Sequence, residues 1–232
     1  KRSGDYAGRI SSLTSTVKMA FVYQFSSSIN AGPIYARFYL YIATLPSGAV
    51  GIARFPNGPN TDSPATLALN LDNAGVLTSN LVSGSFTLST GTWYRIEMRV
   101  DASGAAGSHI AAFGVDGTYN TATNLTISPA GQQSLAMGGN LNNEAVSTGD
   151  WFFDDVAIND STGSNQNSWP GDGKIIHLKP NATGDSATWT PTTGDNYTNV
   201  DEVTPNDATD IVSSNTLNQE DLYNMAASGI GA

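Results

Sequence analysis

The sequence predicts an all-β protein: an antiparallel sandwich of two packed sheets, followed by a β-rich arm. Apolar and polar residues alternate over several stretches, with the period of two that is typical of half-buried strands. Turn residues separate these stretches at intervals of roughly 8–12 residues, the spacing of sandwiches and barrels. Charged residues are only 13% of the 232-residue chain, about half the usual share, which disfavours helical bundles and coiled coils.

Three stretches show the alternation most clearly, at 17–25, 34–42 and 93–101. Each places an apolar row on one face and a more polar row on the other, so we expect half-buried strands whose apolar faces pack against a second sheet. In the second stretch the outward row is Tyr35, Arg37, Tyr39 and Tyr41. Shorter candidate strands are 49–55, 66–71, 85–89, 108–116, 132–137 and 150–158.

Two of these strands carry motifs of a known family. Residues 91–100 (GTWYRIEMRV) follow the pattern G-x-W-Y-x-I-x-x-x-V, and 151–160 (WFFDDVAIND) resemble a final strand of the type FDDV. Both are similar to concanavalin A-like lectin/glucanase jelly rolls, including laminin-G-like domains. The resemblance covers residues 1–160 and implies a two-sheet jelly roll, a fold that serves lectins, hydrolases, adhesion modules and virion proteins alike.

The rest of the chain predicts a linker at 161–172 and an extended arm or truncated second β module at 173–232. The linker is rich in Ser, Asn and Gly, and the arm contains few large aliphatic residues, too few to bury a core of its own. We expect one strand at 173–179 and a short helix or coil at 216–229. We also expect the arm to pack on the first domain or on a neighbouring subunit.

The arm also resembles the structural proteins of tailed bacteriophages. The resemblance rests on residues 169–180 (WPGDGKIIHLKP), 187–202 and 210–223. It implies a non-catalytic virion structural protein at the virion surface, a head decoration or fibre that assembles with other virion proteins and with copies of itself. Aromatic and apolar side chains of this region are the expected assembly contacts: Trp169, Trp189, Tyr197, Leu222 and Tyr223.

Net charge excludes one class of partner. The chain carries −10 overall, which disfavours nucleic-acid binding. The acids are concentrated late: residues 141–232 hold fourteen of the twenty acids and two of the ten Lys and Arg. Such a region is a solvated acidic surface, a cation site or a face for a basic partner. No apolar run approaches the length of a membrane-spanning helix.

Catalysis by paired carboxylates is not expected. Sandwich glucanases resembling this chain use a strand motif of the type E-x-D-x-x-E, whose period of two sets acids on one face. Here Phe152 stands between Asp150 and Asp155, and the adjacent Asp154 and Asp155 should point to opposite faces. The sequence therefore predicts that the protein is not an enzyme.

Calcium is the one metal ion for which the sequence offers candidate ligands, because calcium prefers the hard oxygen atoms of carboxylates. The candidate ligands are Asp154, Asp155 and Asp160. In the alternative, one carboxylate of the 154–155 pair caps a turn or accepts backbone hydrogen bonds, and the other faces solvent.

A carbohydrate-binding lectin module is the alternative function. Sugars stack on exposed aromatic rings, and the row Tyr35, Arg37, Tyr39 and Tyr41 is the candidate surface. The same row could instead lie beneath the arm or beneath a sheet edge. A lectin requires an open aromatic groove, whereas the virion role requires intersubunit contacts through residues 165–232.

Overall fold

The structure is a computed structural model that describes residues 1–3, 6–11, 19–29, 32–57, 65–127, 132–141, 147–173, 178–202 and 209–226. The chain divides into two compact units, residues 1–174 and residues 175–232, and each is described by itself. Among the described residues the helical structure is a single 3-10 turn, so no helix there is long and apolar enough to cross a membrane.

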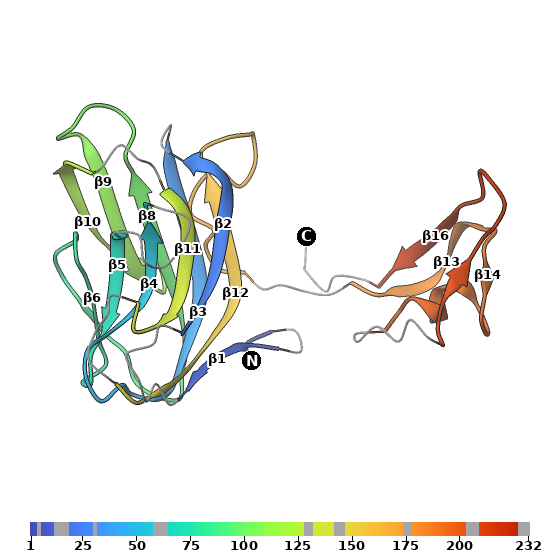
Figure 1. The fold of residues 1–232 in the computed structure, drawn as a ribbon, viewed down its shortest axis with the longest axis horizontal. Coiled ribbons are helices and arrows are strands. Elements are labelled where there is room, and N and C mark those ends of the chain that lie inside the picture. Colours follow the sequence, from blue (N-terminus) through green and yellow to red (C-terminus); the bar gives the residue numbers. More distant parts are fainter. Residues whose placement is uncertain are drawn as a thin grey trace. The chain divides into compact units, whose positions relative to one another are not determined.

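The first unit is a sandwich of two antiparallel sheets, each with six strands among the described residues (Figure 1). Sheet A runs in the order β1 (Gly8–Ser11), β12 (Asp150–Asp160), β3 (Pro33–Thr44), β8 (Trp93–Asp101), β9 (His109–Val115) and β10 (Thr118–Leu125). Sheet B runs in the order β2 (Met19–Ile29), β11 (Gln132–Gly139), β4 (Val50–Pro56), β5 (Ala65–Leu71), β6 (Val76–Ser79) and β7 (Phe86–Thr87). The chain passes repeatedly between the sheets, and the predicted all-β jelly-roll sandwich is confirmed.

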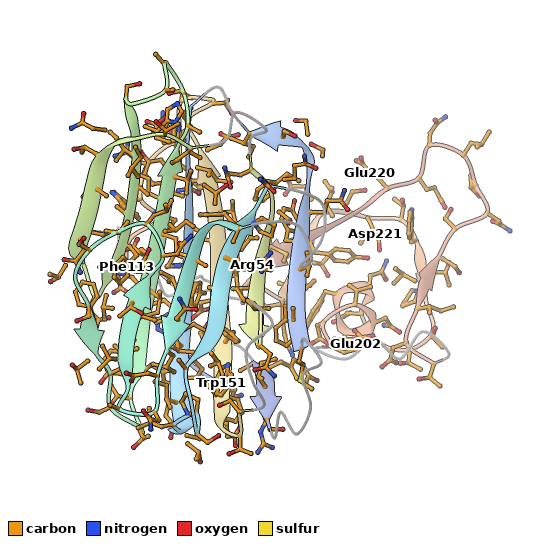
Figure 2. The ribbon with its side chains drawn as sticks, turned by 60° about the vertical axis from the view of Figure 1, so that its left-hand side comes forward. Arg54, Phe113, Trp151, Glu202, Glu220 and Asp221 are labelled. Atoms are coloured by element: carbon orange, nitrogen blue, oxygen red, sulfur yellow. The ribbon has the colours of Figure 1, made fainter. Side chains whose placement is uncertain are left out.

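Both sheets direct apolar rows into one core between them. The even-numbered row of β3, from Ile34 to Ile42, is essentially inaccessible to solvent, as predicted from its alternation. Trp151 is fully buried, and its indole Nε1 donates a 2.9 Å hydrogen bond to the carbonyl of Gly138. Because Trp151 lies on β12 and Gly138 on β11, this bond joins the two layers (Figure 2 labels Trp151).

Strand β2 departs from its predicted burial. Its residues form a strand, but Met19, Phe21 and Tyr23 of the expected inward row are 45%, 43% and 62% exposed. The reason is position: β2 is the last strand of sheet B in the described chain, and the last strand of sheet A, β1, has only four described residues. Most of β2 therefore has no strand of the other layer to cover it. Strands β1, β6 and β10 were not predicted.

The described residues of the second unit form two small antiparallel pairs and the 3-10 turn. Strand β13 (Pro180–Ala187) pairs with β16 (Asp221–Met225), and β14 (Thr190–Pro191) pairs with β15 (Val212–Ser213). The turn, η1 (Asn196–Asn199), is fixed by the buried Asn199, whose amide donates to the carbonyls of Thr193 and Asp195.

The expectation of a helix or coil at 216–229 is wrong for 221–225. These residues form β16 because β13 presents a backbone edge to them, and pairing outweighs the local capping pattern. Of the strand expected at 173–179, residues 174–177 lie outside the described residues.

Candidate functional site

The predicted ligand row lies on the outer face of sheet A, as its alternation indicated. Across the β3–β8 pair, Tyr35 faces Arg99, Arg37 faces Glu97, Tyr39 faces Arg95 and Tyr41 faces Trp93. This face therefore carries interleaved aromatic and charged side chains.

A segment that overlaps the end of the predicted linker covers most of this face. Residues 169–173, here named the strap, lie over it, and Trp169 packs against Tyr35 and Tyr119 with ring centroids 5.1 and 4.5 Å away. Of the predicted row, Tyr35, Arg37 and Tyr39 are at most 8% exposed, and only Tyr41 is half-buried. The row is therefore covered and does not form an open groove. Coverage was the alternative to an exposed sugar-binding surface in the sequence analysis.

Beneath the strap, Glu97 is fully buried and fully bonded. Its carboxylate accepts hydrogen bonds from Arg95 Nε at 3.1 Å, from the hydroxyl of Tyr119 at 2.6 Å and from the backbone amide of Gly171 at 2.9 Å. Burial and the bond to Glu97 raise the pKa of Tyr119 to about 12. Burial, followed by the bond to Asp172, also raises the pKa of Tyr39. Both phenols therefore remain protonated donors at neutral pH.

The three predicted calcium ligands do not converge. Asp154 accepts the backbone amides of Arg2 and Ser3, at 2.6 and 3.3 Å, while Asp155 forms a 2.7 Å ion pair with the Arg2 guanidinium. Asp160 instead bonds Thr162. Within the described part of the chain, no three His, Cys, Asp or Glu side chains gather closely enough to hold a metal ion.

The prediction that Asp154 and Asp155 point to opposite faces is wrong. Both carboxylates reach the segment of Arg2 and Ser3. The β12–β3 register shifts between Asp154 and Ala157, and Asp155 has a φ of +47°. This bulge interrupts the period of two that a regular strand would keep.

The expected assembly residues are divided between the two units. Trp169 is used within the first unit, as described above. In the second unit, Trp189 and Leu222 are 38% and 45% exposed, Tyr197 is half-buried, and the Tyr223 hydroxyl donates to Asp221 at 2.8 Å. Assembly through these side chains stays a prediction.

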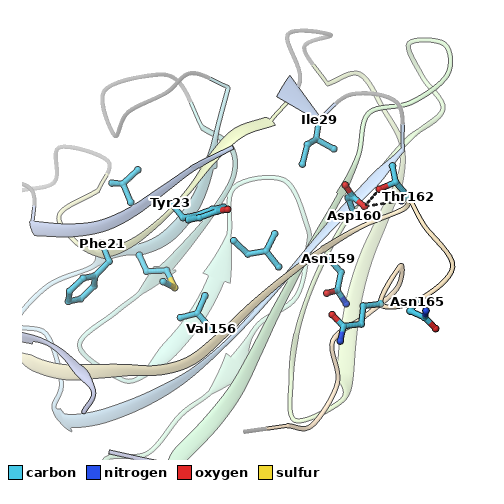
Figure 3. Close-up of a pocket in the computed structure, with 12 residues that line it drawn as sticks. Phe21, Tyr23, Ile29, Val156, Asn159, Asp160, Thr162 and Asn165 are labelled. Carbon is cyan, nitrogen blue, oxygen red and sulfur yellow. Dashed lines mark hydrogen bonds between the residues drawn. The ribbon is translucent and has the colours of Figure 1, made fainter. Parts of the chain in front are cut away.

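A hollow of the sandwich opens elsewhere, between the edge strand β2 and the half of β12 that β1 does not accompany. Strand β1 pairs only with residues 150–153 of β12, so residues 156–160 have no neighbour on that side in the described chain. The hollow, here named the edge pocket, has a volume of about 720 Å³ (Figure 3). Its described lining is Phe21, Val22, Tyr23, Ile29, Met137, Val156, Ile158, Asn159, Asp160, Thr162, Asn165 and Gln166.

The edge pocket is apolar along the strands and polar at one end. Phe21, Tyr23 and Val156 form part of the apolar wall, whereas Asp160 and Asn165 lie at the polar end (Figure 3). The apolar side chains come from β2, β11 and β12, while the polar ones come from the end of β12 and the loop after it.

Asp160 is held as an ionised acceptor. Thr162 donates to one carboxylate oxygen from its backbone amide, at 2.9 Å, and from its hydroxyl, at 2.6 Å. These two hydrogen bonds lower the pKa of Asp160. Asn159 beside it is anchored to the carbonyl of Ser168 at 2.8 Å. The polar end is therefore ordered by the first residues of the segment that was expected to be a plain linker.

Sequence reasoning missed this pocket, although a signal was present. Residues 19–25 carry large apolar side chains on both faces, including Val22 among the outward positions. A strand that is apolar on both faces, followed much later by an Asn- and Gln-rich segment, could have indicated an open edge with a polar rim.

No protein-family profile matches the chain, and neither does any curated protein. Among solved structures, alginate lyase AlgAT5 from polysaccharide lyase family 7 matches with a TM-score of 0.40 and 12% identity, over 60% of this chain and 62% of that chain. A variant of the family 7 alginate lyase A1-II′ gives 0.41 and 14%, over 56% and 64%. The Trypanosoma rangeli sialidase gives 0.39 and 12%, over 54% and 20%.

These matches correct one prediction. The expectation that the protein is not an enzyme is contradicted, because the solved structures that it resembles are those of enzymes, alginate lyases and a sialidase. The expectation rested on the absence of one carboxylate motif, which concerns only hydrolysis by paired acids. None of the comparisons bears on a bacteriophage origin, which stays a prediction.

Proposed function

We propose that the protein binds neutral carbohydrate chains in the edge pocket. The observation that carries the proposal is the pairing of exposed aromatic rings with a fixed polar rim in one hollow of suitable size. Sites for small organic ligands combine an apolar wall with a few well-placed polar groups, in cavities of roughly 300–1,000 Å³.

The aromatic wall suits the C–H face of a pyranose ring. Phe21 and Tyr23 are 43% and 62% exposed on the edge strand, so both rings are accessible to a ligand. The Phe21 ring is braced, because it meets Phe153 edge-on with centroids 6.4 Å apart. A braced ring offers contact area at small cost in side-chain entropy.

The polar end suits sugar hydroxyls. Asp160 keeps acceptor capacity on its carboxylate, and the side-chain amides of Asn165 and Gln166 supply both donors and acceptors. Asp160 is also the one charged side chain among the described residues of the lining, which contains no Lys or Arg. An anionic chain would meet only this negative charge, so a neutral one is favoured.

The virion role does not gain a comparable observation. It requires contacts between chains, and the fold of neither unit favours it over carbohydrate binding. The assembly residues and the surface of a virus particle therefore remain expectations of the sequence resemblance.

A glycan array followed by calorimetry tests the proposal. The probes are cello-, laminari- and xylo-oligosaccharides, with Tyr23→Ala and Asp160→Asn as pocket variants and Tyr41→Ala, on the outer face of sheet A, as the matched control. We expect each pocket variant to weaken binding about tenfold, which corresponds to about 1.4 kcal/mol, and the control to bind as the wild type does.

The proposal is overturned if no neutral glycan binds, or if Tyr41→Ala alone abolishes binding. Chromatography of the bound oligosaccharide after incubation reports whether the chain also shortens it.

A further inference from the structure

The strap occupies the outer face of sheet A with one aromatic ring and one carboxylate. The Trp169 ring lies against Tyr35 and Tyr119. Three residues later, the carboxylate of Asp172 accepts hydrogen bonds from the Tyr39 hydroxyl and from Arg2 Nη2, the latter at 3.0 Å. A ring in an aromatic slot and an anion in a phenol–guanidinium cradle therefore lie side by side on one face.

Arg37, beneath the strap, is a buried cation without a counter-ion among the described residues. Arg37 is only 5% exposed, and its Nε has no hydrogen-bond partner. Its contacts are a 3.3 Å bond from Nη1 to the carbonyl of Gly171 and the ring of Tyr39, whose centroid lies 5.5 Å from the guanidinium carbon. Glu97, the facing residue on β8, is engaged by Arg95, Tyr119 and Gly171 instead.

A buried guanidinium of this kind is costly unless an anion meets it. Arg also binds carboxylates in a bidentate geometry that neutral acceptors do not match. The strap supplies only a backbone carbonyl to Arg37 and leaves its Nε unpaired. The closed face thus retains capacity for an anionic group that the strap does not satisfy.

The strap is also weakly anchored on its N-terminal side. Residues 161–168 are all exposed and form no strand or helix. The strap itself is held by two ring contacts of Trp169 and a small set of polar bonds, and the Asp172 side chain is 74% exposed. Lifting such a segment exposes few apolar atoms apart from Trp169 and its slot.

We propose that the strap covers a second carbohydrate site, for chains that carry carboxylates, and that Trp169 and Asp172 occupy the places of a sugar ring and a uronate group. The slot of Tyr35 and Tyr119 takes the ring, and Arg2, Arg37 and Tyr39 take the carboxylate. This site is separate from the edge pocket and differs from it in the charge of its ligand.

Removing the strap's own ligand-like groups tests this site. Polygalacturonate is the carboxylate-bearing probe, and fully methyl-esterified polygalacturonate is its neutral counterpart. We expect Trp169→Ala to bind polygalacturonate at least tenfold more tightly than the wild type, with no gain for the ester. Asp172→Asn, which keeps the ring, should give a smaller gain, and Trp189→Ala in the second unit should give none.

Arg37→Gln added to Trp169→Ala should remove the gain, whereas Tyr23→Ala in the edge pocket should leave it intact. This separates failure of the second site from failure of the proposed function. The proposal is wrong if Asp172→Asn and a folded Trp169→Ala both bind no better than the wild type. It is equally wrong if the affinity for the ester, or for dextran sulfate as an anionic chain without carboxylates, rises as much as the affinity for polygalacturonate.

Discussion

The backbone amide of Gly171 donates a 2.9 Å hydrogen bond to Oε1 of Glu97, a side chain with no solvent exposure at the centre of sheet A. The two residues are 74 positions apart in the chain. Through this bond the strap shares one carboxylate with Arg95 and Tyr119. The closed outer face and the order of the strap therefore depend on the same buried group.

Replacing Glu97 with Gln should destabilise the first unit. The change leaves Arg95 without its anion in a half-buried position, and loss of one partner of a buried ion pair typically costs several kcal/mol. Because the Arg95 side chain remains partly exposed to solvent, which limits the loss, we expect the free energy of unfolding to fall by about 2–3 kcal/mol. Urea denaturation measures this change. Arg9→Gln breaks the exposed pair with Asp150 and should cost under about 1 kcal/mol. Equal effects from both variants would refute the special role of Glu97.

Adding a methyl group at Gly138 should separate β2 from β11. A Cβ at this position would lie 1.9 Å from the carbonyl oxygen of Met19 and 2.8 Å from the Cα of Ala20. Backbone cannot yield as a flexible side chain can, so Gly138→Ala should displace β2 and with it the Phe21 and Tyr23 wall.

Hydrogen exchange checks this prediction. The amides of β2 and β11 should exchange at least tenfold faster in Gly138→Ala, while those of β8 and β9 stay protected. Gly48→Ala is the control, because a Cβ at Gly48 meets nothing within 4 Å. Unchanged protection of β2 would show that the two strands are not held at this close approach.

Stability of the first unit should fall as the pH rises above about 10. The pKa of Tyr119 is about 12 in the folded protein and about 10 in an unfolded chain. A raised folded pKa means that the stabilisation is complete below the unfolded value and is lost as the pH rises through the folded one.

Urea unfolding at pH 9, 10, 11 and 12 measures this loss, and Tyr119→Phe should show a shallower decline because it lacks the titrating phenol. Tyr39 titrates in both proteins and cancels in the comparison. If the two proteins decline in parallel, the Tyr119–Glu97 bond makes no contribution to the stability of the folded state.

The second unit should loosen when Asn199 is replaced with Ala. The residue is 1% exposed, and its amide donates to the carbonyls of Thr193 and Asp195. An unsatisfied buried carbonyl costs about 1–3 kcal/mol, which is large for a unit with two small sheets. Amides of β13 and β16 should exchange faster, whereas Leu217→Ala, at a residue 90% exposed, should change nothing. Protection that survives in Asn199→Ala would contradict this role.

The sandwich was predictable because its alternation is a local consequence of burial on one face. The even-numbered rows of 34–42 and 93–101 pack against the core as predicted, although part of each odd-numbered row is buried as well. Where the alternation failed, the cause was not local. The bulge at Asp155 brings neighbouring carboxylates to one segment, and the open edge beside β2 exposes a row that resembles a core row.

The candidate site was harder to predict, because it depends on contacts between distant segments. Nothing in the sequence of 169–173 shows that Trp169 would fill a slot between Tyr35 and Tyr119 and cover the predicted ligand row. The pocket at the sheet edge likewise requires knowing that β1 begins only at Gly8, opposite Phe153 of β12. Contacts between segments far apart in the sequence, rather than the existence of single strands, decide both features.

The most direct test of carbohydrate binding in the edge pocket is a glycan titration followed by NMR of methyl and aromatic groups. The first neutral oligosaccharide that binds on the array should shift the signals of Ile29, Met137, Val156 and Tyr23, which line the pocket, and leave those of Leu69 in the core in place. Shifts confined to Tyr41, Trp93 and Phe152 on the outer face of sheet A, or no shifts at all, would contradict the account.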